Sequence, residues 1–491
     1  MTESAAADSA HNRFSFGAWL FLRALAAIYA IAFVSFWRQS AGLVGPNGIL
    51  PAQPFFDAVH AQLGPRAYLE LPSLCWWWGA DRSLPLLCAA GLVCSALLFA
   101  GIAPALSLGA LWAVYLSLCG AGQIFYGFQW DSLLLEASVL AVFLAPWSLL
   151  PRWRRFEPPR LSLLLLWWLL FRLMVLSGAA KLMSGDPTWR DLTALTFHYE
   201  TQPLPTAIGW YAHQLPAWFQ RVSALLMFAV ELLVPFALFA PRAFRHLAAL
   251  LITVFMVLIG LTGNYTFFNF LTAALCVLWL DDAWWQRVLR RPKSDEGRAL
   301  APFAAPVWPL RLFAIFAFGY TAMVSLPTLG NSPTLYRLRQ PVDEIVGPFR
   351  SFNSYGLFAV MTHPRPELSI EGSNDGREWL AYEFPHKPGA LTRAPTWVAP
   401  MQPRLDWQLW FAALMPPEQN PWVPELCRHL LRGTPEVLAL FAHNPFPGQP
   451  PRLVRVVRYE YHFTDPAALR RTGHWWRRTP LDYYVSPLSL R

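Results

Sequence analysis

Charged residues are scarce in this chain of 491 residues: 14% are Asp, Glu, Lys or Arg, and 55% are hydrophobic. Soluble proteins carry about 25% charged residues. Long apolar runs recur along the first two thirds of the chain, and many of its 25 tryptophans flank them. Runs of this kind cross bilayers, and tryptophan favours the interfaces. The composition excludes an ordinary soluble protein and predicts a polytopic membrane protein.

Paired cysteines are also lacking. None of the six cysteines forms a CxxC pair, which excludes a zinc ribbon or thioredoxin-like redox motif. Three lie inside apolar runs, where a free thiol packs as a small apolar side chain. Whether Cys75, Cys119 and Cys427 form a disulfide stays open.

The familiar catalytic motifs are missing. The sequence has no serine nucleophile elbow, Walker loop, HExxH, or GxGxxG in a suitable context. We therefore expect no covalent or metal mechanism, no metal and no cofactor. The net charge of +9 is not gathered in a basic patch interleaved with stacking aromatics, so we expect no nucleic-acid partner.

The apolar runs predict an α-helical membrane bundle of about nine transmembrane helices. We expect a disordered N-terminus (1–15), a membrane domain (16–330) and a C-terminal extramembrane domain (335–491). The first run is long enough to span and lacks a cleavage-like exit, so we expect a retained helix. The predicted spans are Phe16–Phe36, Leu84–Ile102, Ala105–Cys119, Ser132–Trp147, Leu161–Lys181, Val222–Phe239, a segment ending near Leu261, Phe267–Leu280 and Trp308–Leu326.

Arginines gather in the loops after spans four, six and eight. Positive loops face the cytoplasm, so the N-terminus lies inside and the C-terminus outside. The residues around Asp131, the loop 188–205, the loop at Gly263 and everything after span nine then share the outer side. This shared side is the predicted functional face.

Beyond Leu335 the composition changes to alternating, proline-rich segments, which predict a β-sandwich-like domain with helical insertions. A β-hairpin is predicted in which two strands are joined by a turn at Asp375-Gly376. Further strands are predicted at Ser354–Phe358, Arg404–Ala412 and Val457–Phe463, and short helices at Pro424–Leu431 and Pro435–Phe441.

Three stretches carry a family resemblance. They are Trp189–Thr193 with Phe197–Pro203, Gly263–Asn269, and Ala399–Gln408. Their composition and order resemble the lipase maturation factor family. The residues that carry the resemblance are Trp189, Arg190, Asp191, His198, Tyr199, Glu200, Gln202, Asn264, Tyr265 and Asn269.

The resemblance implies a membrane-embedded maturation factor, or chaperone, that assists the folding and assembly of secreted client proteins, namely lipases. Animal members sit in the endoplasmic reticulum membrane. Short loops and no retrieval tail fit a bacterial inner membrane equally well, with the domain in the periplasm. Carried over by position, the client-binding candidates are Gln402, Arg404, Asp406 and Trp407. The client's identity and the oligomeric state stay open.

Lys181 supports an alternative function. It follows Gly178 in a pattern similar to the membrane domain of vitamin K-dependent carboxylases, which implies an enzyme that acts on a lipid-soluble cofactor or an exported substrate, with Lys181 as base. His198, Glu200 and Asp131 would complete its site. That family's histidine motif is replaced here by Tyr126–Asp131, which argues against carboxylation. The other prediction for the loop 188–205 is a packed, hydrogen-bonded lid.

Charges inside the spans need partners. Arg172 and Glu231, deep in spans five and six, either mark a functional site or form a mutual ion pair that fixes the helix register. We expect Asp131 or Glu136 to be a buried partner for Arg23 or Lys181. The small residues 177–180 should let another helix approach closely.

Overall fold

The computed structural model describes residues 13–151, 156–290, 306–329 and 333–490. Most of the predicted disordered N-terminus lies outside this part of the chain. So do residues 152–155 of the basic loop after span four and residues 291–305 of the loop after span eight.

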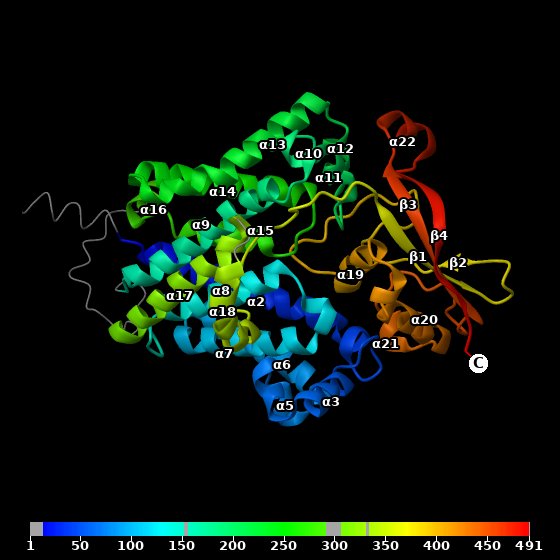
Figure 1. Cartoon of the computed structure of the whole chain (residues 1–491), viewed down its shortest axis with the longest axis horizontal. Coiled ribbons are helices and arrows are strands. Elements are labelled where there is room, and N and C mark those ends of the chain that lie inside the picture. The colour runs from blue at the N-terminus through cyan, green and yellow to red at the C-terminus, as the bar shows by residue number, and fades with distance from the viewer. Residues whose placement is uncertain (1–12, 152–155, 291–305, 330–332, 491) are drawn as a thin grey trace, which may run out of the picture.

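The predicted fold class is confirmed: a helical membrane bundle precedes a domain that contains a small antiparallel sheet (Figure 1). Every predicted span is helical. Among the described residues, seven helices are long and apolar enough to cross a membrane: α2 (Ser15–Val44), α6 (Ala80–Ala100), α7 (Pro104–Ala121), α9 (Arg160–Met183), α13 (Ala217–Leu232) continued by η4 (Val234–Phe239), α14 (Arg242–Thr262) and α17 (Val307–Leu329).

The other two predicted spans are shorter helices. α8 (Gln129–Leu144) has 16 residues and α15 (Phe268–Val277) has 10, so they rise only about 24 Å and about 15 Å. Both are largely buried among the longer helices, so neither has to match the thickness of the bilayer. Beyond α15, the carbonyls of Leu278 and Trp279 accept hydrogen bonds from Trp167 and Arg245. Irregular backbone is tolerated at membrane depth when it is satisfied in this way.

The two ends of the bundle are chemically distinct. At one end the N–H of Asp282 donates to the carbonyl of Arg13, and Arg242 pairs with Asp281 at 3.1 Å. The other end carries the sheet domain, and we call it the domain end. Short helices complete the connections: α3 (Ala52–Leu63), α4 (Ala67–Glu70), α5 (Cys75–Trp78), α10 (Pro187–Arg190), α11 (Leu195–Thr201), α12 (Ala207–His213), α16 (Asp282–Val288) and α18 (Pro333–Val346).

The domain contains one four-stranded antiparallel sheet of order β2-β1-β3-β4, so it is a sheet with helices against it rather than a two-sheet sandwich. The strands are β1 (Pro366–Ser373), β2 (Leu380–Ala381), β3 (Leu453–Phe463) and β4 (Trp476–Leu488). Glu371 pairs with Ala381 across the predicted hairpin, and Ile370 faces Val456 in β3. The helices are α19 (Arg404–Ala413), α20 (Trp422–Arg432), α21 (Pro435–Leu438) and α22 (Pro466–Thr472).

Two predicted strands are wrong. Arg404–Ala412 forms helix α19, in which Leu405, Leu409 and Ala412 recur at helical spacing and are all buried. A short segment buried on most sides shows no clear alternation, so its period is ambiguous. Ser354–Phe358 is irregular and packs on the bundle, where a Cβ on Gly356 would meet Ala180 at 2.8 Å.

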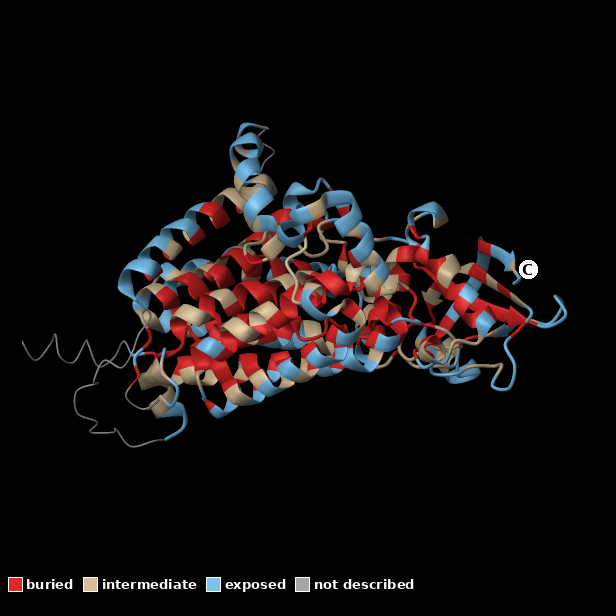
Figure 2. Cartoon of the chain, turned by 90° about the horizontal axis from the view of Figure 1, so that it is seen from below, coloured by how far each residue is buried: buried red, intermediate tan, exposed pale blue. Residues whose placement is uncertain are grey.

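Bundle and domain share one large apolar core. One cluster of buried apolar residues includes Phe36 of α2, Trp130 of α8, Trp407 of α19 and Val456 of β3. Figure 2 shows the buried residues running from the bundle into the domain. Burial of this continuous surface favours one relative placement of the two parts.

Candidate functional site

Most of the residues singled out in the sequence lie where the domain contacts the bundle. We call this contact region the joint, formed by the domain end of the bundle, the signature loop (residues 188–205) and residues 351–410. The sequence supplies it from the ends of α2, α8 and α9, from the loop at Gly263 and from the start of the domain.

A buried ion pair lies at the centre of the joint. Asp131, in the first turn of α8, pairs with Arg404, the first residue of α19, at 3.3 Å. The guanidinium of Arg404 also lies 3.6 Å from the ring centroid of Tyr126 and donates to the carbonyl of Phe125. Its side chain is 0% exposed. A fully buried cation requires this compensation, so Asp131 serves Arg404 rather than the predicted Arg23 or Lys181.

Gln402 and Trp407 surround this ion pair. The indole N–H of Trp130 donates to Gln402 Oε1 at 3.1 Å. The hydroxyl of Ser35 in α2 donates to the carbonyl of Gln402 and accepts from its backbone N–H. The rings of Trp130 and Trp407 lie 4.8 Å apart, edge to face. The client-binding candidates Gln402, Arg404, Asp406 and Trp407 are at most 3% exposed. Side chains so deeply buried offer a client no surface in this conformation.

A second buried pair joins α8 to α9 and reaches the domain. Glu136 pairs with Arg172, so the predicted pairing of Arg172 with Glu231 is wrong. Glu136 Oε2 also accepts from Asn353 N at 2.9 Å and from the Tyr355 hydroxyl at 2.7 Å. Glu136 and Arg172 lie in consecutive helices, 36 positions apart, and only the packing of α8 on α9 decides that they meet.

Lys181 belongs to a third pair. Its Nζ lies 2.8 Å and 2.9 Å from the two carboxylate oxygens of Glu231 in α13, and 5.6 Å from the ring of Trp189. The small residue Gly178 permits this approach, since a Cβ there would meet Leu232 at 2.7 Å. The expected close helix contact is thus present. An amine held by both oxygens of a buried carboxylate is poorly placed to act as a free base.

The signature loop folds into the short helices α10 and α11 and packs on the loop after α14. The Tyr265 hydroxyl donates to Gln202 Oε1 at 2.7 Å and lies 3.1 Å from His198 Nε2. Burial, and then the charge of Lys181, lower the pKa of His198 to about 4. Asn264 Oδ1 accepts from Val398 N and Ala399 N at 2.8 Å and 3.0 Å. The loop is therefore a hydrogen-bonded link between bundle and domain.

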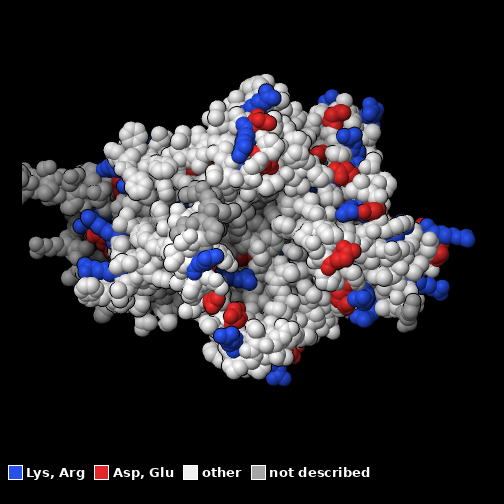
Figure 3. Space-filling view, viewed as in Figure 1, with Lys and Arg blue, Asp and Glu red and all other residues white. Residues whose placement is uncertain are grey.

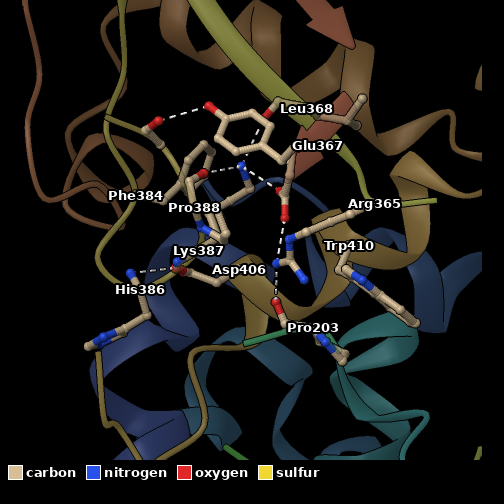
Figure 4. A network of polar contacts seen from close by, with 12 residues as sticks. Pro203, Arg365, Glu367, Leu368, Phe384, His386, Lys387, Pro388, Asp406 and Trp410 are labelled. Atoms are coloured by element: carbon tan, nitrogen blue, oxygen red, sulfur yellow. Dashed lines mark hydrogen bonds and ion pairs between the residues drawn. The ribbon is translucent and has the colours of Figure 1, made fainter. Parts of the chain in front are cut away.

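Arg365 ties the domain to the backbone of the signature loop. This buried arginine precedes β1 and donates to the carbonyls of Glu200, Gln202 and Pro203. Arg365 also forms an ion pair with Glu367 at 2.8 Å, and Glu367 forms a second ion pair with Lys387 at 3.1 Å (Figure 4). The planar guanidinium presents five N–H donors in a fixed fork, so it can reach acceptors on both sides that the three donors on the single nitrogen of a lysine would not reach together.

Asp406 in α19 belongs to the same network of polar contacts (Figure 4). Its Oδ1 accepts from the backbone N–H groups of His386 and Lys387, each at 2.8 Å. Burial raises the pKa of Asp406, and these two N–H groups oppose the rise. Asp406 therefore fixes the path of the chain before α19.

The remaining signature residues occupy varied positions. Glu200 accepts from Phe463 N in β3 and faces His462 at 3.3 Å. Trp189 donates to the carbonyl of Phe358 at 3.0 Å. Tyr199 is half-buried. Arg190, the last residue of α10, and Asp191, which follows it, are both exposed. Asn269 is buried in α15.

Each of the four residues of the alternative site has a different partner. Lys181 contacts Glu231, Asp131 contacts Arg404, His198 contacts Tyr265, and Glu200 contacts β3. Two cavities of the described part of the chain, one near Asn374 in the domain and one near Gln53 beside the bundle, are lined by other residues. The described residues contain no group of three or more His, Cys, Asp or Glu side chains arranged to hold a metal ion. Cys75, Cys119 and Cys427 are free and buried, so no disulfide joins them.

Sequence reasoning missed several residues of the joint. Arg365, Glu367 and Lys387 carried no motif, and Ser35 and Gln39 stand in an apolar span. Gln39 donates to the carbonyl of Gln402 at 2.7 Å and accepts from Arg404 N at 2.8 Å. The available signal was the polarity itself, because a polar side chain in a span needs a partner.

Comparisons with known proteins cover both parts of the chain. The family model described as "Lipase maturation factor transmembrane domain" matches residues 16–287, and "Lipase maturation factor C-terminal domain" matches residues 351–486. Lipase maturation factor 1 of Mus musculus is 37% identical over 96% of this chain and 86% of its own length. Lipase maturation factor 2 of Homo sapiens is 35% identical over 96% of this chain and 82% of its own length. No solved structure matches.

Proposed function

The chain belongs to the lipase maturation factor family, and on this premise we propose that it is an integral membrane factor that promotes the folding and assembly of exported lipases. Its domain would meet the client, and its bundle would hold that domain at the membrane surface. The vertebrate relatives favour the endoplasmic reticulum membrane over a bacterial inner membrane, with the domain in the lumen.

The contacts made by the predicted site residues carry this proposal. Arg404, Asp131 and Asn264 join bundle to domain, and none of them is among the residues that line the cavity near Asn374 or the cavity near Gln53. A joint with buried ion pairs and a continuous apolar core is typical of a fixed arrangement of parts. A factor that presents a surface to folding clients needs such an arrangement, whereas an enzyme needs a reachable reacting group.

Gln402, Arg404, Asp406 and Trp407 then act on the client indirectly, by positioning the domain. We propose that an acidic client surface contacts the exposed side of β3 and β4, which together carry four arginines against two carboxylates. Tyr483 is 57% exposed on β4, and Arg and Tyr are the side chains that most often dominate protein interfaces. Figure 3 shows charged side chains of both signs over the domain.

Deletion of the gene followed by complementation tests the function. Secreted lipase activity and lipase protein should fall in the deletion strain and return with the wild-type chain, while unrelated exported proteins stay unchanged. Unaffected lipases would overturn the proposal.

The variant Lys181→Arg separates factor from enzyme. Arginine keeps the positive charge toward Glu231 but does not lose a proton in proteins, so it cannot serve as a base. A maturation factor should retain at least about half of its activity, since the ion pair persists. An enzyme that uses Lys181 as base should lose nearly all of it. Lys181→Met, which leaves Glu231 unpaired, is the matched destabilising control.

A further inference from the structure

An interfacial hairpin beside the bundle contains a cavity that the joint does not use. Residues 45–79 leave the domain end of α2 and return to the start of α6, forming α3, α4 and α5 on the way. Figure 1 shows α3 and α5 together at the flank of α6. Trp77 and Trp78 are 72% and 60% exposed. Exposed tryptophans between two spans are typical of the membrane–water interface, so the hairpin lies at the headgroup level.

The cavity has a volume of about 410 Å³ and lies between α3 and α5. This is within the size range of small-molecule sites. Its lining residues are Gln53, Phe56, Asp57, His60, Ala61, Cys75, Trp76 and Gly79. The lining thus includes aromatic rings and one carboxylate, but no lysine or arginine.

The aromatic rings at this cavity form a connected group. The centroids of Phe56 and Trp76 lie 4.6 Å apart, edge to face, and His60 lies 6.1 Å from Trp76. Tyr68 packs on Trp76 at 5.1 Å. The indole N–H of Trp76 donates to the carbonyl of Leu71, which fixes the orientation of the ring. The ring faces are therefore held in place beside the cavity.

The carboxylate is also held in place. Gln53 Nε2 donates to Asp57 Oδ1 at 2.9 Å, and Gln53 Oε1 accepts from Ala80 N at 2.6 Å. No hydrogen bond to Asp57 Oδ2 from another described residue is present. One carboxylate oxygen thus stays available beside the aromatic rings.

We propose that this cavity binds the quaternary ammonium headgroup of a choline phospholipid from the surrounding leaflet. Aromatic faces and a nearby carboxylate attract such a cation, and the absence of basic side chains in the lining disfavours an anionic headgroup. Choline fits better than ethanolamine because a primary ammonium has three N–H donors to satisfy. The site offers few acceptors besides Asp57. The bound lipid would fix the hairpin, and with it the end of α2, to the membrane surface.

Photo-crosslinking of the full chain in nanodiscs tests this assignment. A photoactivatable phosphatidylcholine should label peptides from residues 52–80, and unlabelled phosphatidylcholine should compete. Asp57→Asn and Trp76→Ala should each reduce labelling about tenfold, the loss of about 1.4 kcal/mol of binding. Asp57→Glu should keep labelling within about twofold, and Glu70→Gln, a carboxylate of the same hairpin outside the cavity lining, is the matched control.

Several outcomes would overturn the proposal. Equal labelling by a phosphatidylglycerol probe would show that the charge of the headgroup does not matter. Equal competition by phosphatidylethanolamine would remove the preference for choline. Competition by free phosphocholine but not by phosphatidylcholine would identify a soluble ligand. Unchanged labelling in Asp57→Asn, in a variant that elutes as a single folded species, would remove the carboxylate from the site.

Discussion

Two arginine–aspartate pairs in this protein have the same chemistry and opposite surroundings. Arg404 and Asp131 are 0% and 2% exposed in the joint, whereas Arg458 and Asp482 are 27% and 49% exposed on the sheet. The buried pair is completed by Tyr126, the carbonyl of Phe125 and the Tyr115 hydroxyl. The exposed pair lies at the surface of the domain. Burial therefore decides which pair holds the structure together and which remains available for a partner.

The largest effect is expected from Arg404→Ala. This change leaves Asp131 as a buried, uncompensated charge, which costs about 3–5 kcal/mol of stability. The thermal unfolding midpoint of the purified chain in detergent should fall accordingly, and protease should release the domain. The double variant Arg404→Met with Asp131→Leu should recover much of this loss. A single variant that unfolds like the wild type would contradict the comparison.

A somewhat smaller loss is expected from Arg365→Lys. Lysine keeps the charge toward Glu367 but cannot reach three backbone carbonyls in the same geometry, so about 2–3 kcal/mol should be lost. Limited proteolysis should cut the signature loop faster. Arg452→Lys, at an exposed position just before β3, should leave the cleavage rate unchanged. Equal rates in both variants would show that the carbonyl contacts do not fix the loop.

The joint should also weaken in acid through His198. Its pKa is lowered to about 4 by burial, from about 6.5 in the unfolded chain. Below pH 6.5 His198 binds a proton in the unfolded chain but stays neutral in the folded chain. The free energy of unfolding therefore falls as the pH drops toward 4. Between pH 7.5 and pH 5 the loss is about 2 kcal/mol. Unfolding midpoints at the two pH values measure it, and His198→Gln should remove this share of the dependence. If the pH dependence were unchanged in that variant, the loss of stability in acid would come from groups other than His198.

Trp130→Phe tests how much one neutral hydrogen bond of the joint contributes to stability, compared with the buried ion pair. It removes the contact to Gln402 Oε1 but keeps a ring against Trp407, so stability should fall by about 1–2 kcal/mol. Trp77→Phe, at an exposed position, should have no effect on the unfolding midpoint. A loss as large as that of Arg404→Ala would mean that neutral contacts dominate the joint.

The smallest effect on stability is expected from Arg458→Ala, because exposed ion pairs contribute about 0–1 kcal/mol. If the sheet meets an acidic client, this variant should still lower the yield of active lipase in the complementation assay. One substitution would then impair contact with the client without impairing the folding of the factor itself. A normal lipase yield from Arg458→Ala combined with Arg477→Ala would move the client surface away from the sheet.

The spans and strand β3 were predictable because each depends on a local pattern. Arg172 shows where such reasoning ends. Its partner had to be a buried acid, but Glu136 and Glu231 were both available in neighbouring spans, and only helix packing chose Glu136. Helix α19 shows the same limit for secondary structure, since its surroundings rather than its pattern decided its conformation.

By itself, the sequence determined that the chain enters a membrane repeatedly and ends in a folded domain, since hydropathy and periodicity depend only on neighbouring residues. It also determined that polar residues in and beside the spans needed partners. Only the tertiary structure decided that Asp131 meets Arg404, 273 positions away, and that the client-binding candidates lie inside the joint. Such pairings depend on how helices and sheet pack, because burial and partner distance are properties of the assembled fold.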